Sequence, residues 1–235
     1  MKRLLDTPRP RPVIPNGLAS EGPAMELPIP ETKAQACRLA NAVAGNSSLN
    51  NLRLHVAKAV PVDSTVLWWL FSHDEARASA LSDLQIHIED QPTGDTDWVR
   101  ALCDALSTNL KTSSAHLTLP WWDGDMKLLG QAICKSPWLS SLTLGGNLPN
   151  IGILEFLHAL ESRTCQLQSL SFPGSSFSNT LVEAAIRAAR RNSSLTKLDL
   201  GDTPLTPDQC DRIRTALWGY RNAETWNALI AGGRA

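Results

Sequence analysis

The chain has 235 residues, 43% of them hydrophobic, and a formal net charge of -1. This length suffices for one or two domains with a sizeable core, and the near-neutral charge argues against nucleic acid or an anionic membrane as a partner. The sequence lacks a run of about 20 apolar residues, the length that a membrane helix needs. The opening MKRLL runs into DTPRPRP without the apolar core of a signal peptide, so we expect a cytoplasmic protein. Export by a route that needs no signal peptide remains an alternative.

Charge and cysteine are unevenly placed along the chain. Residues 63–104 contain nine Asp and Glu but two Arg, whereas 1–62 and 187–235 lean positive, which favours a protein partner with a basic surface. The five cysteines are far apart and form no CxxC pair. This spacing indicates small apolar core residues in a reducing compartment rather than a disulfide framework or a zinc site.

The N-terminal segment differs in amino-acid composition from the rest of the chain. Residues 1–30 contain seven of the fifteen prolines, and proline lacks a backbone donor and fixes φ, so this segment cannot build the interior of a helix or sheet. We predict a disordered or extended Pro-rich arm over 1–30. The following ETKAQACRLANAVAG is typical of a helix that ends at Gly45.

An internal repeat organises residues 31–235. The phrase NSSL occurs at 46–49 and again at 192–195, and alignment on L-x-x-L-x-L gives six copies whose first positions step by 32, 33, 25, 28 and 28 residues. The last two steps match the upper end of the leucine-rich-repeat range. The six copies are Leu49-Leu52-Leu54, Leu81-Leu84-Ile86, Ser114-Leu117-Leu119, Leu139-Leu142-Leu144, Leu167-Leu170-Phe172 and Leu195-Leu198-Leu200.

Each copy predicts one strand followed by one helix. In x-L-x-L-x the leucines recur every two residues and therefore point to the same side of a strand. Helical periodicity fills the gaps at 98–109, 153–163 and 180–192. Stacked strand–helix units of this kind form an α/β solenoid with a curved parallel sheet on the concave face and helices on the convex face. The last residues then form a helical cap, in which Trp218, Tyr220 and Trp226 could close the core.

Residues 139–205 resemble ribonuclease-inhibitor-type leucine-rich repeats, in which L-x-x-L-x-L-x-x-N-x-L precedes a helix. Asn147 stands at the position of the family's asparagine, which satisfies backbone groups in the turn after the strand, and Ser175 and Thr203 stand there in later copies. The resemblance implies a protein-binding scaffold rather than an enzyme. A disordered arm before such repeats is also similar to the layout of bacterial effectors that act in a host cell, an analogy of architecture alone.

The residues between the leucines predict the partner-binding surface. They would line the hollow of the solenoid as a polar groove of mixed charge. They are Asn51, Arg53, His55, Asp83, Gln85, His87, His116, Thr118, Ser141, Thr143, Ser169, Ser171, Lys197 and Asp199. An acidic rim of Glu89, Asp90, Asp95 and Asp97 adjoins them.

Two tryptophan pairs need a separate interpretation, because adjacent residues cannot both face one core. Trp121 and Trp122 follow the third strand, and we expect one of them to be exposed or held in a loop. Both join the predicted binding surface, since tryptophan is enriched in interface hot spots. The alternative is that both pack under a loop. Trp68 and Trp69, inside the apolar VLWWLF, are expected in the core.

The sequence also contains weaker candidates for catalytic or metal-binding residues. The sequence shows no P-loop, HExxH, GxSxG or Rossmann fingerprint. His55 and His87 occupy equivalent positions in adjacent copies and could begin a metal site with Glu89, and His116 could serve a hydrolase. Asp123 and Asp125 resemble a fragment of a calcium loop. We therefore favour a protein-interaction scaffold without metal or cofactor over a metal-binding or hydrolytic enzyme or a self-associating structural solenoid, and oligomeric state stays open.

Overall fold

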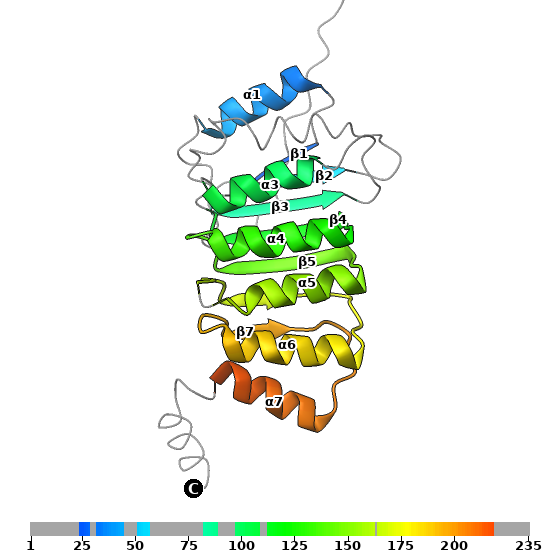
Figure 1. Cartoon of the computed structure of the whole chain (residues 1–235). Helices are drawn as coiled ribbons and strands as arrows, with labels where there is room; N and C mark the ends of the chain where they lie inside the picture. Colours follow the sequence, from blue (N-terminus) through cyan, green and yellow to red (C-terminus); the bar gives the residue numbers. More distant parts are fainter. Residues whose placement is uncertain are drawn as a thin grey trace, which may run out of the picture.

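The computed structural model describes residues 24–28, 32–44, 51–56, 82–88, 97–108, 112–162 and 164–218. Its described strands form one parallel sheet in which every strand lies beside its predecessor in the sequence (Figure 1). The strands are β1 (Ala24–Pro28), β2 (Asn51–Val56), β3 (Asp83–Ile88), β4 (Ser114–Pro120), β5 (Ser141–Asn147), β6 (Ser169–Ser171) and β7 (Lys197–Asp199).

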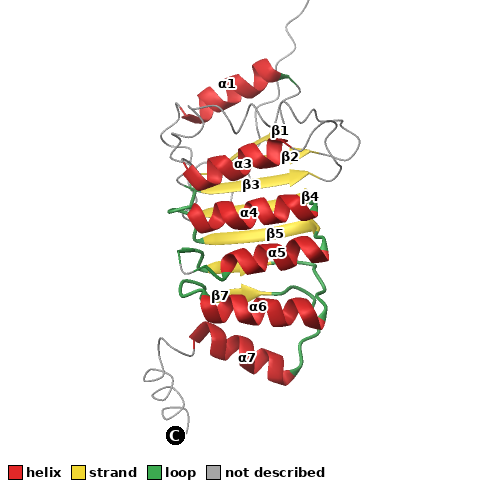
Figure 2. Ribbon diagram, in the orientation of Figure 1, coloured by secondary structure: helices red, strands yellow, loops and turns green. Residues whose placement is uncertain are grey.

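Helices alternate with the strands and form a second layer. Helices α3 to α7 lie in a row over one face of the sheet, each in contact with its neighbour (Figure 2). The described helices are α1 (Lys33–Ala44), α3 (Asp97–Thr108), α4 (Asp123–Lys135), α5 (Asn150–Leu160), α6 (Asn179–Arg191) and α7 (Pro207–Trp218). No described element covers the opposite face, which we call the open face. The predicted alternation of parallel strands and helices is confirmed.

The core lies between the two layers, where the sequence pattern places it. Burial alternates along β3, whose Leu84, Ile86 and Ile88 are at most 2% exposed. Ala115 of β4, Leu142 of β5 and Leu170 of β6 are fully buried at the register position of Leu84. The two-residue period of the leucines therefore does separate a helix-facing core from polar residues on the open face.

The third copy of the repeat is displaced by two residues from its predicted alignment. Leu84 pairs with Ala115 rather than with Leu117, and Ile86 pairs with Leu117. Thr112, only 1% exposed, then occupies the place of the first leucine. The unit was misaligned because small residues replace two of its leucines, while Leu119 beyond them supplies a false match.

The N-terminal arm also differs from its prediction. Residues 24–28 form β1, which pairs in parallel with β2 and lies at the edge of the sheet. Proline is excluded from the sheet interior but tolerated in edge strands, and Pro28 is the last residue of β1. The other residues of the predicted arm lie outside the described residues, as do Trp68, Trp69, Tyr220 and Trp226. Trp218, expected to close the core, is 53% exposed.

A ladder of hydrogen bonds joins successive units just before strands β4 to β7. The hydroxyls of Ser113 and Ser140 each donate to the backbone carbonyl of the residue one unit earlier, Ser82 and Ser113, at 3.0 Å. Thr196 Oγ1 does the same to Gln168 O at 3.1 Å. Each of these carbonyls also accepts two backbone N–H groups from the next unit. We call this series of junctions the carbonyl ladder.

The turn after β7 contains Thr203, one of the residues that the sequence resemblance placed at an asparagine position. Thr203 Oγ1 accepts a hydrogen bond from Phe177 N at 2.9 Å and donates to Leu200 O at 2.7 Å. Thr203 thus satisfies backbone groups of two neighbouring units, as expected for that position. Asn147, at the equivalent position after β5, is instead exposed at the strand end.

Candidate functional site

The register of the strands arranges the open-face side chains in rows that cross the sheet. Every predicted sheet residue of the binding surface lies in one of three rows, and their role in binding stays a prediction. The first row is Asn51, Asp83, Ser114, Ser141, Ser169 and Lys197. The second is Arg53, Gln85, His116, Thr143, Ser171 and Asp199. The third is His55, His87 and Thr118, followed by Gly145.

Ser114 is the member of these rows that the sequence prediction missed. It was missed because of the two-residue displacement of its unit. A shift of two residues keeps each side chain on its face but changes its neighbour. His116 therefore stays on the open face, yet lies beside Gln85 and not beside Asp83.

A cluster of polar side chains occupies the first two rows at β2 and β3. Asp83 Oδ2 accepts hydrogen bonds from Asn51 Nδ2 at 2.8 Å and from Gln85 Nε2 at 2.9 Å. Three atoms of the cluster are buried without a hydrogen-bond partner among the described residues: Asn51 Oδ1, Asp83 Oδ1 and Arg53 Nε. Buried polar atoms are usually paired, so this part of the face has unused hydrogen-bonding capacity.

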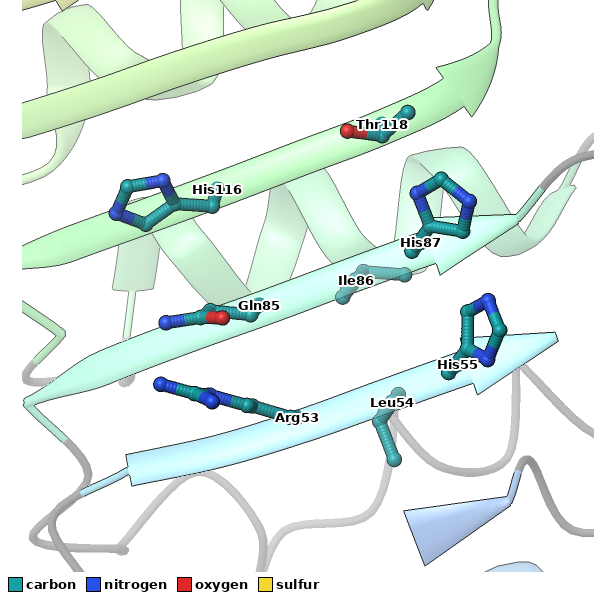
Figure 3. Close-up of a pocket in the computed structure, with 8 residues that line it drawn as sticks. All are labelled: Arg53, Leu54, His55, Gln85, Ile86, His87, His116 and Thr118. Atoms are coloured by element: carbon teal, nitrogen blue, oxygen red, sulfur yellow. The ribbon is translucent and has the colours of Figure 1, made fainter. Parts of the chain in front are cut away.

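A hollow of about 380 Å³ adjoins the cluster, between the second and third rows (Figure 3). His55 and His87 lie one above the other at its far side, with ring centroids 4.9 Å apart and a 35° interplanar angle. The expectation that these two histidines are near neighbours is confirmed. The described lining residues are Arg53, Leu54, His55, Gln85, Ile86, His87, His116 and Thr118.

The hollow does not supply a protein metal site from the residues that can be placed. Within the described ranges, no group of three or more His, Cys, Asp or Glu side chains could hold a metal ion. Glu89, the expected third ligand, lies outside those ranges, as do Asp90 and Asp95 of the predicted acidic rim.

The opposite end of the open face, at β6 and β7, is polar. Ser171 Oγ donates to Asp199 Oδ2 at 2.7 Å, and Gly201 N donates to Asp199 Oδ1 at 3.0 Å. These two hydrogen bonds hold the pKa of the Asp199 carboxyl below its ordinary value, and the bond from the Ser171 hydroxyl has the larger effect. Asp199 is thus an ionised, positioned acceptor at the far end of the second row.

The Trp121–Trp122 pair divides between the core and the surface. Trp121 is 4% exposed and its Nε1 donates to Gly145 O at 3.0 Å, so burial removes it from the predicted binding surface. Trp122 is 58% exposed where α4 begins. The expectation that one member of the pair is exposed is confirmed, and the alternative, that both pack under a loop, is wrong.

The carboxylates after this pair serve helix starts and not a calcium loop. Asp125 Oδ2 accepts a hydrogen bond from Trp122 N at 3.2 Å, and Asp123 Oδ1 accepts from Gly152 N at 2.8 Å. The second bond ties the start of α4 to the start of α5. Burial raises the pKa of Asp125, against the lowering effect of the Trp122 N–H.

Two of the five free cysteines contact each other across neighbouring units. Cys134 Sγ donates to Ala159 O at 3.1 Å. The neighbouring Cys134 thiol, helped by hydrogen bonds from Leu167 and Asn192, lowers the pKa of the Cys165 thiol to about 7 against the opposing effect of burial. The sequence prediction treated all five cysteines as separate core residues and missed this pair.

Among the described helices, none combines the length and the apolar character that crossing a bilayer requires. No family model matches the chain. Its sequence is similar to part of NACHT, LRR and PYD domains-containing protein 14 of Mus musculus, at 34% identity over 116 residues that cover 46% of this chain and 11% of that protein. The chain therefore spans about a tenth of that relative.

The fold is similar to a solved structure of leiomodin-1 actin-binding site 2. The TM-score is 0.48 and the identity 14%, over 63% of this chain and 87% of that one. The sequence match relates part of this chain to a protein whose name includes leucine-rich repeats.

Proposed function

We propose that this chain is a leucine-rich-repeat solenoid of the ribonuclease-inhibitor type that binds a protein partner on the open face of its sheet and catalyses no reaction. The observation that carries the proposal is the set of in-register polar rows across β2 to β7, on a face that no described element covers. Repeat folds of this kind offer such rows as extended binding surfaces.

Layer dimensions support the inference that the open face is hollow. Packed helices lie roughly 8–10 Å apart, whereas paired strands lie about 4.7–4.9 Å apart. Since each unit contributes one strand and one helix, the helix layer has to be the longer arc. The sheet then lies on the concave side, where a partner can contact several strands at once.

Site-specific photocrosslinking tests this function. A benzophenone amino acid placed at Thr143 or Ser171 lies on the open face, whereas the same residue at Gln131, exposed on α4, lies on the helix side and is the matched control. In cells that make the protein, we expect discrete adducts with a partner protein from the two open-face positions and none from Gln131. Adducts from Gln131 alone, or none from the open face, would contradict the proposal.

Three narrower proposals accompany this function. The charge balance of residues 63–104 supports a basic patch on the partner's rim-facing surface. The sequence composition supports a cytoplasmic location. The layout of a Pro-rich segment before repeats supports a bacterial effector that enters a host cell without a cleaved signal, and detection of the protein in host cytosol tests this version.

Two alternatives have direct tests. The His55–His87 contact favours a metal-binding function over a hydrolytic one, and a stoichiometric transition metal in the purified protein would support it. Self-association of the solenoid predicts a mass that rises with concentration in light scattering.

A further inference from the structure

The hollow on the open face is bounded by two walls of side chains that carry hydrogen-bond donors (Figure 3). Successive open-face positions on one strand are two residues, roughly 6.6 Å, apart, so a small polar group fits between the walls. The side chains of the two walls are Arg53, Gln85 and His116 on one side and His55, His87 and Thr118 on the other.

The lining is rich in donors and carries one permanent charge. Of the described residues around the hollow, none is a carboxylate, and Arg53 alone is a fixed cation. Arginine stays protonated in proteins, and each imidazole offers at least one N–H in either protonation state. A ligand that enters the hollow therefore meets an excess of donors.

The Arg53 guanidinium makes no ion pair with a side chain that the structure describes, and Glu26 of β1 stands beside Arg53 in the strand register. Its Nε is buried and makes no hydrogen bond there. The nearby carboxylate, Asp83, directs Oδ2 to Asn51 and Gln85 instead, and the described ion pairs do not include Arg53. The planar guanidinium matches a carboxylate in shape and charge, so an incoming carboxylate would pair with this group.

We propose that this hollow receives an acidic side chain, aspartate or glutamate, from the partner protein, with Arg53 as the anchor and His55 and His116 as further donors. The inference rests on the proposed function, because it names what the open face recognises. A carboxylate fits better than a phosphoryl group: its single negative charge matches the one fixed cation of the lining. The absence of acidic lining residues among those described disfavours a basic side chain.

Binding of charged peptides to the full chain tests the proposal. The probes are fluorescein-labelled peptides of six glutamates, six glutamines, six lysines, or phosphoserine alternating with glycine, followed by anisotropy. We expect the glutamate peptide to bind tightest, and added salt to weaken it. Tighter binding of the lysine or the phosphoserine peptide would overturn the proposal.

Matched variants locate the binding. Arg53→Gln removes the anchor, and Lys197→Gln removes one positive charge from the same face at β7. We expect the glutamate peptide to bind Arg53→Gln about tenfold more weakly and Lys197→Gln within about twofold of the wild type. Equal losses in both variants would refute a role for the hollow. If circular dichroism shows that Arg53→Gln is unfolded, His116→Gln at an exposed position takes its place. We then expect a smaller loss of affinity for the glutamate peptide, and an unchanged affinity would refute the proposal.

The outcomes separate this inference from the proposed function. Crosslinks from Thr143 that persist unchanged in Arg53→Gln, together with no preference for the glutamate peptide, would leave the function standing and remove the acidic ligand. Absence of crosslinks in the wild type would remove the function, whatever the peptides do.

Discussion

Truncation of Leu142 measures how strongly one unit of the repeat holds the sheet together. Leu142 is fully buried, and its register neighbours are Ala115 and Leu170, which are also fully buried. Leu142→Ala removes three methyl(ene) carbons between two fixed strands and the helix layer, where little can collapse into the space. We therefore expect a loss of about 3–5 kcal/mol in the free energy of unfolding, the upper part of the range for buried leucines.

Urea unfolding followed by circular dichroism measures this loss, and thermal unfolding should show a fall of roughly 6–20 °C. Ile151→Ala is the control, because Ile151 is 65% exposed at the start of α5 and should change stability by no more than about 0.5 kcal/mol. Equal effects of the two substitutions would show that the leucines of β5 do not face the core, and the arrangement of the rows on the opposite face would fail with them.

Three further predictions concern local structure. Gly201→Ala should destabilise the protein by about 1–3 kcal/mol in thermal unfolding, because φ of Gly201 is +61° and an added Cβ would lie 2.2 Å from Phe172 O. The control is Gly124→Ala in α4, where an added Cβ has no atom within 4 Å, so this substitution should be neutral or stabilising. Trp121→Phe should cost about 1–3 kcal/mol by unpairing the Gly145 carbonyl, whereas Trp122→Phe should not, and urea unfolding distinguishes them. Arg212 holds the pKa of the Glu183 carboxyl below its usual value. The ionised Glu183 therefore adds stability that is fully present above the ordinary pKa of glutamate and is lost as pH falls through the lowered pKa. Glu183→Gln should flatten the decline in melting temperature on acidification, and an unchanged slope would count against the Glu183–Arg212 ion pair.

The repeat could be predicted because it is a collective pattern. A leucine followed two residues later by Leu, Ile or Phe recurs in all six aligned units, and a single buried face explains this spacing. The third unit could not be placed from sequence, since Thr112 and Ala115 fill leucine positions with side chains that carry no such signal. The strand β1 was missed because a proline-rich segment excludes the sheet interior but not its edge.

The face of the sheet on which the site lies could be predicted from the sequence, but the side-chain contacts within the site could not. Strand periodicity places Arg53, His55 and His87 on one face, and their equivalent positions in adjacent units place the two histidines together. Whether Arg53 pairs with Asp83 depends on side-chain rotamers, which the sequence pattern does not predict. Likewise, no local pattern distinguishes Trp121 from Trp122, because the difference arises from the point at which the strand ends and α4 begins.

The carbonyl ladder makes each strand–helix unit an exchangeable part. The junction residues Ser113, Ser140, Gln168 and Thr196 follow one another after 27, 28 and 28 residues, and every junction needs only a backbone carbonyl on one side and N–H groups on the other. A tandem duplication of residues 140–167 would therefore present the same acceptor and the same donors at both of its seams. The protein can lengthen by whole units, and each added unit would extend the polar rows by one column without redesign of the core.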